Sequence, residues 1–167
     1  KNQVAHRVEI DAERAVELGA RCTRALGPFA AARHQDDALG AKWETVRDVR
    51  SVVTGALELQ RAAKAIGSSL EAAPVVHLHD AALRILLASV DMAEVAITSD
   101  LTLTDAPAPA EAFTLDQVKG VAVVVRRAEG RKCARSWRYT TDVGADPAWP
   151  DVSARDAAAL SELKALG

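Results

Sequence analysis

The sequence predicts an α+β fold in which a helical segment is followed by a small α+β C-terminal module. Three observations support this prediction. Residues 1–66 are rich in Ala, Glu and Arg, a mixture that favours helices. The run at residues 121–125, which is β-branched except at Ala122, is typical of a strand. The chain has 167 residues, of which 49% are hydrophobic and 26% charged, as expected for one globular domain or a domain with a small appendage.

Two helices are expected in the first part of the chain. A short one is predicted at residues 11–26, because Gly27-Pro28 stops it. A long amphipathic helix is predicted at residues 36–66, capped by Asp36 or Asp37 and ended by a left-handed C-cap at Gly67. Its apolar side chains recur every three or four residues and form one stripe. They are Leu39, Trp43, Val46, Val49, Val53 and Leu57.

The pattern changes after Gly67. We expect a short strand at residues 74–78, a helix at 81–89 and one or two strands at 95–103. Residues 105–111 form an extended polar linker by composition, and a strand follows at 118–127. The chain is then irregular until Ser153, which is placed to cap a last helix at residues 154–166.

Composition excludes several classes of protein. Lys and Arg total 21 against 23 Asp and Glu, so the formal charge of −2 provides no global basic field for nucleic acid. Two cysteines, Cys22 and Cys133, cannot build a disulfide framework, which fits a cytoplasmic protein. The longest apolar runs, at residues 85–90 and 121–125, are too short to span a bilayer, so no membrane partner is expected.

Signatures of known enzyme sites are absent from the sequence. There is no G-x-S-x-G elbow, no phosphate loop and no H-E-x-x-H motif. Gly67-Ser68-Ser69 resembles a phosphate cradle only by composition, and a helix terminator explains it better. His77 and His79 would share one strand face, where two imidazoles can bind metal. Because no third ligand is near, exposed or capping histidines are the favoured interpretation.

A basic and aromatic segment is the most informative feature. Phosphate-neutralising cations alternate there with rings on which unstacked bases can rest, a pattern typical of RNA binding. The cations are Arg126, Arg127, Arg131, Lys132, Arg135 and Arg138, opposed by Glu129, and the rings are Trp137 and Tyr139. The alternative is a solvated loop whose aromatic side chains fill a minor core. A thinner basic group, diluted by acidic neighbours, lies on the long helix at Arg47, Arg50, Arg61 and Lys64.

Two stretches resemble bacterial isoleucyl-tRNA synthetases. Residues 43–50 (WETVRDVR) and 57–72 (LELQRAAKAIGSSLEA) are similar to the end of the helical anticodon-binding domain of that family. Residues 129–144 (EGRKCARSWRYTTDVG) resemble the start of its C-terminal zinc-binding module, where the pattern is Lys-Cys-x-Arg-Cys-Trp, a Tyr two residues later, and Asp-Val-Gly. The resemblance covers about residues 36–163 in the order of the family.

The resemblance implies three parts: the end of the anticodon-binding domain at residues 1–67, a small α+β junction module at 68–127, and a degenerate zinc-ribbon-like module at 128–167. The family binds zinc through four thiolates, which close a tetrahedral site. At the corresponding positions this sequence has Cys133, Ser136, Ser153 and Asp156. Because three of the four thiolates are gone, we expect no metal and no other cofactor. Packing of Trp137, Tyr139, Trp149 and the last helix is expected to take the place of the metal.

The resemblance also implies partners, namely the anticodon stem-loop of isoleucine tRNA and the catalytic domains of the parent synthetase. Trp137 would stack on a base, and Arg135 would hydrogen-bond or stack. Phosphate contacts would come from Arg131, Lys132 and Arg138, and from Arg47, Arg50, Arg61 and Lys64 on the long helix. The catalytic motifs His-x-Gly-His and Lys-Met-Ser-Lys-Ser are missing, as is the editing domain. The chain alone is therefore expected to be inactive, as a C-terminal piece of the synthetase or a free-standing relic.

Alternative functions remain open at this level. The chain could be a docking module that braces the synthetase or binds a protein, with the apolar stripe around Trp43 as its interface. A weaker alternative is a relic enzyme with Cys133 as nucleophile. Residues 1–35 fit the family poorly, because its Val-His-Leu before the long helix is absent. Two interpretations are open: a divergent or truncated N-terminal helix, or the hypothesis of a reading-frame change near Arg21-Cys22.

Overall fold

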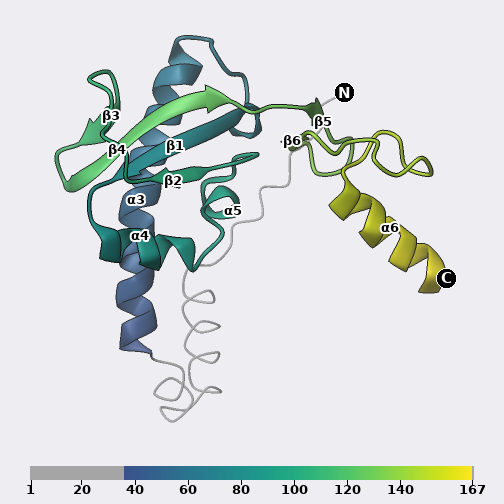
Figure 1. Ribbon diagram of the computed structural model, residues 1–167, viewed down its shortest axis with the longest axis horizontal. Coiled ribbons are helices and arrows are strands. Elements are labelled where there is room, and N and C mark those ends of the chain that lie inside the picture. Colours follow the sequence, from purple (N-terminus) through teal and green to yellow (C-terminus); the bar gives the residue numbers. More distant parts are fainter. Residues whose placement is uncertain (1–35, 167) are drawn as a thin grey trace, which may run out of the picture. The chain divides into compact units, whose positions relative to one another are not determined.

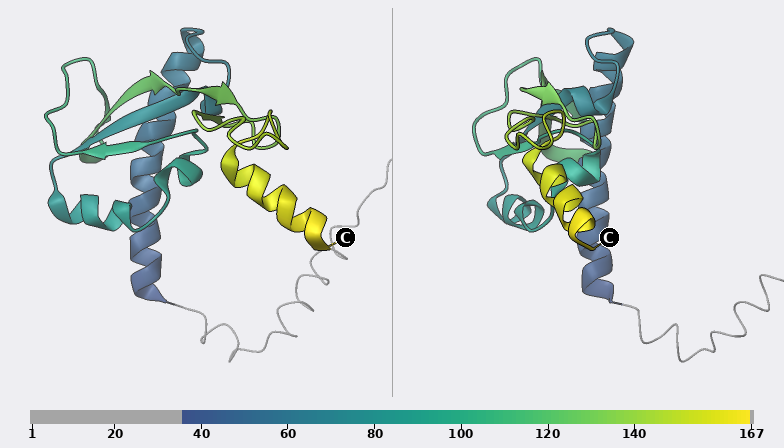
Figure 2. Two further views of the ribbon diagram at one scale, coloured as in Figure 1. Left: turned by 45° about the vertical axis from the view of Figure 1, so that its right-hand side comes forward. Right: turned by 90° about the vertical axis from the view of Figure 1, so that its right-hand side faces the viewer.

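A computed structural model describes residues 36–166 of the chain. From Ala41 onward the chain forms one compact unit, which contains a four-stranded sheet, a long helix and a C-terminal hairpin with its own helix. The two views of Figure 2 show the long helix, α3 (Asp37–Ala62), crossing one face of the sheet. The α+β prediction is confirmed. The predicted helix at residues 11–26 and the Arg21-Cys22 position lie outside the described residues.

Helix α3 begins where the sequence predicts. The Asp36 carboxylate accepts a hydrogen bond from the Leu39 amide at 2.9 Å, which satisfies one of the free N–H groups of the first turn. One stripe of the helix is buried, and it consists of Val46, Val49, Val52, Val53, Ala56 and Leu57. Leu39 and Trp43, which precede this stripe, are 49% and 39% exposed. The predicted apolar stripe is therefore buried only from Val46 onward.

The end of α3 differs from the prediction. The helix stops at Ala62, and Lys64 adopts the left-handed conformation with φ 57°. The Ala65 amide then donates to the Gln60 carbonyl at 2.9 Å, which is the bond of a Schellman cap. The prediction of a left-handed Gly67 is wrong, because the last carbonyls are already satisfied three residues earlier.

The segment after the helix is no phosphate cradle either. The Gly67 amide donates to a carboxylate oxygen of Glu71 at 3.3 Å. The Ser68 hydroxyl caps the short 3₁₀ helix η1 (Ser69–Glu71) by accepting from the Leu70 amide. An acidic side chain thus occupies the position at which a phosphate would bind.

The four-stranded sheet has the order β2-β1-β4-β3 (Figure 1). Strand β1 (Ala72–Leu78) pairs antiparallel with β4 (Val118–Arg127) along its whole length. The short strand β2 (Thr102–Thr104) pairs parallel with β1, and β3 (Phe113–Leu115) pairs antiparallel with β4. The strands predicted at 74–78 and 118–127 are confirmed.

Two helices connect β1 to β2. The first, α4 (Ala81–Ala88), is capped by Asp80 and agrees with the prediction. The second, α5 (Met92–Ala96), occupies the start of the segment predicted as strand at residues 95–103, so that part of the prediction is wrong. The Asp91 carboxylate accepts from the Glu94 amide at 3.0 Å. This local cap outweighs the weak strand preference of the β-branched residues that follow.

The polar segment at residues 105–111 connects β2 to β3 within the same sheet. Asp105 is ion-paired with Arg84, and the Ala106 carbonyl lies 3.0 Å from Nδ1 of His77. His77 is buried by this contact, whereas His79 lies beyond the end of β1 and is exposed. The two histidines therefore form no metal site, and residues 36–166 contain no cluster of His, Cys, Asp or Glu suited to a metal ion.

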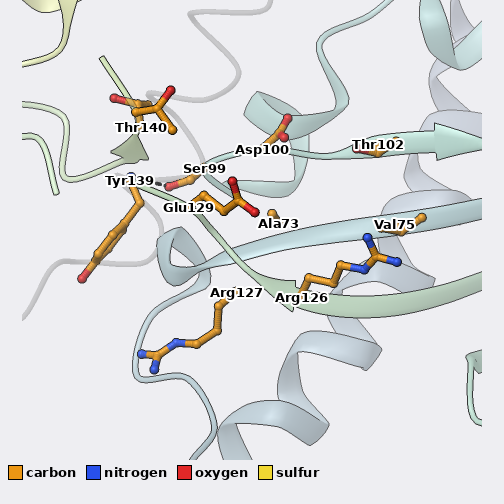
Figure 3. A pocket seen from close by; sticks show the side chains of 11 residues that line it. Ala73, Val75, Ser99, Asp100, Thr102, Arg126, Arg127, Glu129, Tyr139 and Thr140 are labelled. Carbon is orange, nitrogen blue, oxygen red and sulfur yellow. Dashed lines mark hydrogen bonds between the residues drawn. The ribbon is translucent and has the colours of Figure 1, made fainter. Parts of the chain in front are cut away.

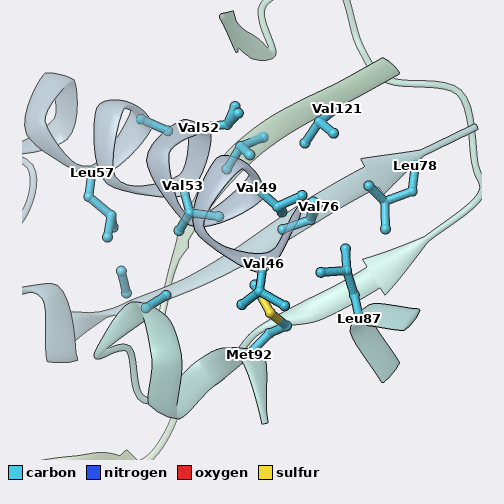
Figure 4. Close-up of a cluster of buried hydrophobic side chains, with 14 of the residues drawn as sticks. Val46, Val49, Val52, Val53, Leu57, Val76, Leu78, Leu87, Met92 and Val121 are labelled. Atoms are coloured by element: carbon cyan, nitrogen blue, oxygen red, sulfur yellow. The ribbon is translucent and has the colours of Figure 1, made fainter. Parts of the chain in front are cut away.

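The hydrophobic core lies between α3 and the sheet. Val46, Val49 and Val53 of the helix face Val76 and Val121 of the strands, as Figure 4 shows. Burial of these side chains stabilises the fold by about 1.5–3 kcal/mol each. A glycine permits the helix to approach β3 closely. A Cβ atom at Gly55 would lie 2.7 Å from Cε1 of Phe113.

The C-terminal part forms a second, smaller core. The hairpin of β5 (Arg131–Lys132) and β6 (Tyr139–Thr140) precedes α6 (Ala154–Leu166), whose bounds match the prediction. The buried residues of this core are Cys133, Val143, Val152 and Ala157, with Trp149 and Leu160 packed against them. The expected packing of Trp149 and the last helix is confirmed, but Trp137 lies outside this core. None of the helices in the described part of the chain could span a membrane.

Candidate nucleic-acid interface

A tight loop joins β5 to β6 and displays a tryptophan. We call residues 133–137 the knuckle. The Trp137 amide donates to the Cys133 carbonyl at 3.0 Å, and the Cys133 amide donates to the Arg138 carbonyl at 2.8 Å. These bonds close the turn so that the indole is 61% exposed. The expectation that the aromatic side chains fill a minor core is therefore wrong for Trp137.

Trp137 is also held in an unfavourable backbone conformation. Its φ of 63° lies in the left-handed region, which costs a residue with a Cβ atom about 1–2 kcal/mol. Strained, bulky residues persist where the surroundings determine the conformation, and they concentrate at functional sites. Glycine would adopt this turn without strain, so the tryptophan lowers the stability of the fold at this position.

Two cations lie at the knuckle. The Lys132 ammonium is 4.8 Å from the centre of the Trp137 ring, which is a cation–π contact. Arg135 is exposed at the loop and has no ion pair among residues 36–166. A third cation, Arg131, lies 3.6 Å from Asp151 in an exposed ion pair that contributes little to stability. The structure thus brings Arg131, Lys132, Arg135 and Trp137 together on one hairpin.

Arg138 is engaged within the protein. Its Nη2 donates to the Ser99 carbonyl at 2.7 Å, and its Nη1 lies 3.9 Å from Glu94. The Ser99 hydroxyl in turn accepts from the Tyr139 amide at 2.7 Å. These bonds hold the hairpin against the segment between α5 and β2. The sequence has no signal for this role, because Arg138 and Ser99 lie 39 positions apart.

The basic residues of α3 contact their own surroundings. Arg47 is 4.0 Å from Glu44 in an exposed pair, and Arg61 bonds to Glu58 and Ser69. Nε of Arg50 donates to the Val95 carbonyl at 2.9 Å, so this side chain holds α3 against the end of α5. Lys64 is the left-handed residue that ends the helix.

The degenerate zinc positions converge in space. The Cys133 thiol donates to a carboxylate oxygen of Asp156 at 3.0 Å, and the Ser153 hydroxyl donates to the same oxygen at 3.1 Å. The Ser153 amide donates to the Cys133 sulfur at 3.4 Å, and Ser136 lines the same small pocket as Ser153 and Asp156. We call Cys133, Ser136, Ser153 and Asp156 the polar cluster. Hydrogen bonds between these side chains connect the knuckle to the start of α6.

The polar cluster determines the ionisation of Asp156 and bears on whether Cys133 could act as a nucleophile. The Cys133 thiol, with help from the serine hydroxyls, holds the pKa of the Asp156 carboxyl below its usual range. The carboxylate is therefore ionised over the physiological pH range and remains an acceptor. Cys133 is fully buried, and no histidine in the described chain contacts it, which argues against a nucleophilic role.

Comparison with known proteins identifies relatives of this chain. No protein-family model matches the chain. Over 136 residues, or 80% of its length, the chain is 68% identical to the isoleucine–tRNA ligase of Mesorhizobium japonicum. It is 66% identical to that of Brucella abortus over 81% of its length, and 60% identical to that of Bartonella henselae over 80%. The chain is homologous to a segment of bacterial isoleucine–tRNA ligases.

The resemblance inferred from the two sequence stretches is thus confirmed. The chain spans about 14% of the length of the ligases that it matches, so they contain much more than this segment. The matched part of the ligases is thus a small segment, and residues 36–166 of the chain comprise the α3–sheet unit, the knuckle and the polar cluster.

Proposed function

We propose that this segment binds the anticodon stem-loop of isoleucine tRNA, with the knuckle as its contact to unpaired bases. The observation that carries the proposal is the exposed Trp137 ring, held out by a strained backbone and flanked by Lys132 and Arg135. Base stacking on an exposed aromatic ring is worth about 1–3 kcal/mol and is typical of single-stranded RNA recognition. The homology to isoleucine–tRNA ligases supports a tRNA partner.

The residues of the hairpin divide by role. In this proposal Trp137 stacks on a base and Arg135 hydrogen-bonds to a base or stacks, because both side chains are exposed at the loop. Arg131 and Lys132 contact phosphates, since each can exchange a weak partner for a phosphate oxygen. Arg138 does not contact the RNA in this proposal, because its guanidinium bonds to Ser99 and Glu94.

The long helix would contact the RNA backbone. Arg47 is mostly exposed and its pair with Glu44 is weak, so it is available to a phosphate, and Lys64 would extend the same role. Arg61 would have to exchange its bonds to Glu58 and Ser69 for a phosphate. Arg50 holds α5 in place and would act only indirectly. The rest of the synthetase, including its catalytic domains in the cytoplasm, would be the protein partner of this segment.

The test compares two variants of the hairpin. Trp137→Ala should lose discrimination between the isoleucine tRNA and an anticodon-swapped tRNA, because base contacts specify. Lys132→Ala should weaken binding of both tRNAs alike. It should also reduce the slope of log affinity against log salt concentration by about one. Fluorescence-anisotropy titration at two salt concentrations measures both effects. Equal losses for both tRNAs in Trp137→Ala would refute the stacking role.

A second candidate function is docking to protein. The first turns of α3 expose Leu39 and Trp43, at 49% and 39%, which is the kind of apolar surface that another helix covers. If this surface is the functional one, Trp43→Ala should abolish a salt-insensitive association and leave tRNA binding unchanged. Analytical ultracentrifugation of the chain, alone and with the remaining synthetase domains, separates this function from the first.

A further inference from the structure

A pocket of about 370 Å³ lies where the sheet meets the C-terminal hairpin. Its floor is Ala73 and Val75 of β1, on the sheet face opposite the α3 core. Its walls are Thr102 of β2, the segment before β2, and the residues that follow Tyr139. The volume is at the lower end of the range for small-molecule sites, which suits one nucleoside and is too small for a helix.

One cation projects into this pocket without a partner. Arg126 lies directly across from Ala73 in the β1–β4 pairing and is exposed. Among the described residues it has neither an ion pair nor a side-chain hydrogen bond. Its neighbour Arg127 is bonded to Glu71 at 3.1 Å and, in Figure 3, extends away from Arg126. The pocket therefore has one guanidinium free to bind a ligand.

Two carboxylates face the same space. Figure 3 shows the Glu129 carboxylate near Ala73 and the Arg126 guanidinium toward Val75, while Asp100 lines the pocket farther from Ala73 and accepts from the Leu101 amide at 2.8 Å. Neither carboxylate is ion-paired to any residue of 36–166. Two acidic groups beside one free cation disfavour a phosphate, because like charges repel. They suit a neutral group that offers N–H donors on one side and acceptors on the other.

We infer that this pocket binds one unstacked nucleobase of an RNA strand. The edge of a nucleobase carries both carbonyl or ring-nitrogen acceptors, which suit Arg126, and N–H donors, which suit Glu129 and Asp100. The strand would thus be held at two points, one base on Trp137 and another in the pocket. This inference rests on the proposed function, because that function supplies the strand.

The test combines one protein variant with altered RNA. The probe is the anticodon hairpin of isoleucine tRNA, intact or made abasic at each unpaired position in turn. Arg126→Gln should lower the affinity for the intact hairpin about tenfold. It should not change the affinity for the one abasic hairpin that lacks the base bound in the pocket. Lys119→Gln removes an exposed cation from the same strand outside the pocket and is the matched control. Glu129→Gln should also weaken binding of the intact hairpin, and it should have no effect on the same abasic hairpin that Arg126→Gln leaves unaffected.

The outcomes separate this inference from the proposed function. Equal losses for every abasic hairpin would mean that Arg126 acts only as a charge, which overturns the pocket. No effect of Arg126→Gln, together with a loss in Trp137→Ala, overturns the pocket and leaves the proposed function intact. If the wild-type chain does not bind the hairpin, the proposed function fails. The pocket is then tested with free nucleosides: NMR shifts at Ala73, Ser99 and Thr102 support it, and their absence overturns it.

Discussion

Trp137 is an exposed aromatic residue held in a backbone conformation that disfavours it. Its φ of 63° would suit glycine, and its ring is 61% exposed, so the indole contributes little to the hydrophobic core. The cation–π contact with Lys132 is worth about 0.5–1 kcal/mol at an exposed site, less than or comparable to the strain. Stability alone therefore does not explain the choice of tryptophan, which fits the proposed stacking role.

Two substitutions at this position separate strain from ring contacts. Trp137→Gly and Trp137→Ala both remove the indole, but only glycine accepts the left-handed backbone without cost. We expect the free energy of unfolding of Trp137→Gly to be about 1 kcal/mol larger than that of Trp137→Ala, so the glycine variant is the more stable. Urea denaturation followed by circular dichroism measures the difference. Both variants should lose tRNA discrimination to the same extent, and equal stability of the two would refute the strain.

Hydrogen bonds connect the C-terminal hairpin to α6 at the positions that the resemblance aligns with zinc ligands. A metal ion holds four ligands by strong bonds, whereas in the polar cluster the Cys133 thiol and the Ser153 hydroxyl donate hydrogen bonds to the Asp156 carboxylate. Asp156 is the central acceptor, since two donors bond to one of its oxygens. The cluster therefore depends on the ionisation of a carboxylate, which a zinc site does not.

This dependence predicts a pH effect. The folded-state pKa of Asp156 is lowered, so its contribution is fully present above the unfolded pKa of about 3.9 and is lost as the pH falls through the folded value. We expect Asp156→Asn to lower the free energy of unfolding by about 1–2 kcal/mol at pH 7. The difference from wild type should shrink below about pH 4, as measured by thermal melts across this range.

Asp151→Asn is the control for this effect. Asp151 belongs to the same module, but its pair with Arg131 is long and exposed at 3.6 Å. Its removal should change the free energy of unfolding by less than about 0.5 kcal/mol at any pH. A pH-independent effect of Asp156→Asn would contradict the role of the carboxylate.

Because the four positions of the polar cluster converge in space, we predict that four cysteines there would bind zinc. A chain carrying Ser136→Cys, Ser153→Cys and Asp156→Cys would present four thiolates from the knuckle and the start of α6. We expect this variant to retain about one zinc ion per chain after dialysis and to melt at a higher temperature with zinc than with a chelator. The unaltered chain should show no such shift. Failure of the variant to bind zinc would show that the positions do not form a tetrahedron.

At the scale of the whole molecule the two cores differ in size. The larger core joins α3 to the sheet, while the core of the hairpin and α6 has four buried residues. Local opening is easier where fewer apolar side chains are buried. We expect the amides of Val76 and Val123 to exchange with solvent at least about tenfold more slowly than those of Cys133 and Ser153. Hydrogen exchange followed by NMR measures this, and uniform rates would indicate one cooperative unit.

Several elements could be predicted because their signals are local. The start of α3 at Asp36, the strand at 118–127 and the last helix depend on caps and periodicity within a few residues. Helix α5 was missed because the Asp91 cap competes with the strand preference of Val95 and Ile97, and composition does not weigh the two. The end of α3 was misplaced because Lys64 adopts a conformation for which glycine was expected.

The sequence by itself determined the class of fold and the family resemblance, since these follow from periodicity and from motifs of contiguous residues. Only the tertiary structure decided what the charged side chains do. Arg138 bonds to Ser99, 39 positions away, and Cys133 bonds to Asp156, 23 positions away. The pocket at Arg126 forms because β1, β2, β4 and β6 meet there. Such contacts depend on how distant segments pack, and no local pattern encodes which cation remains free.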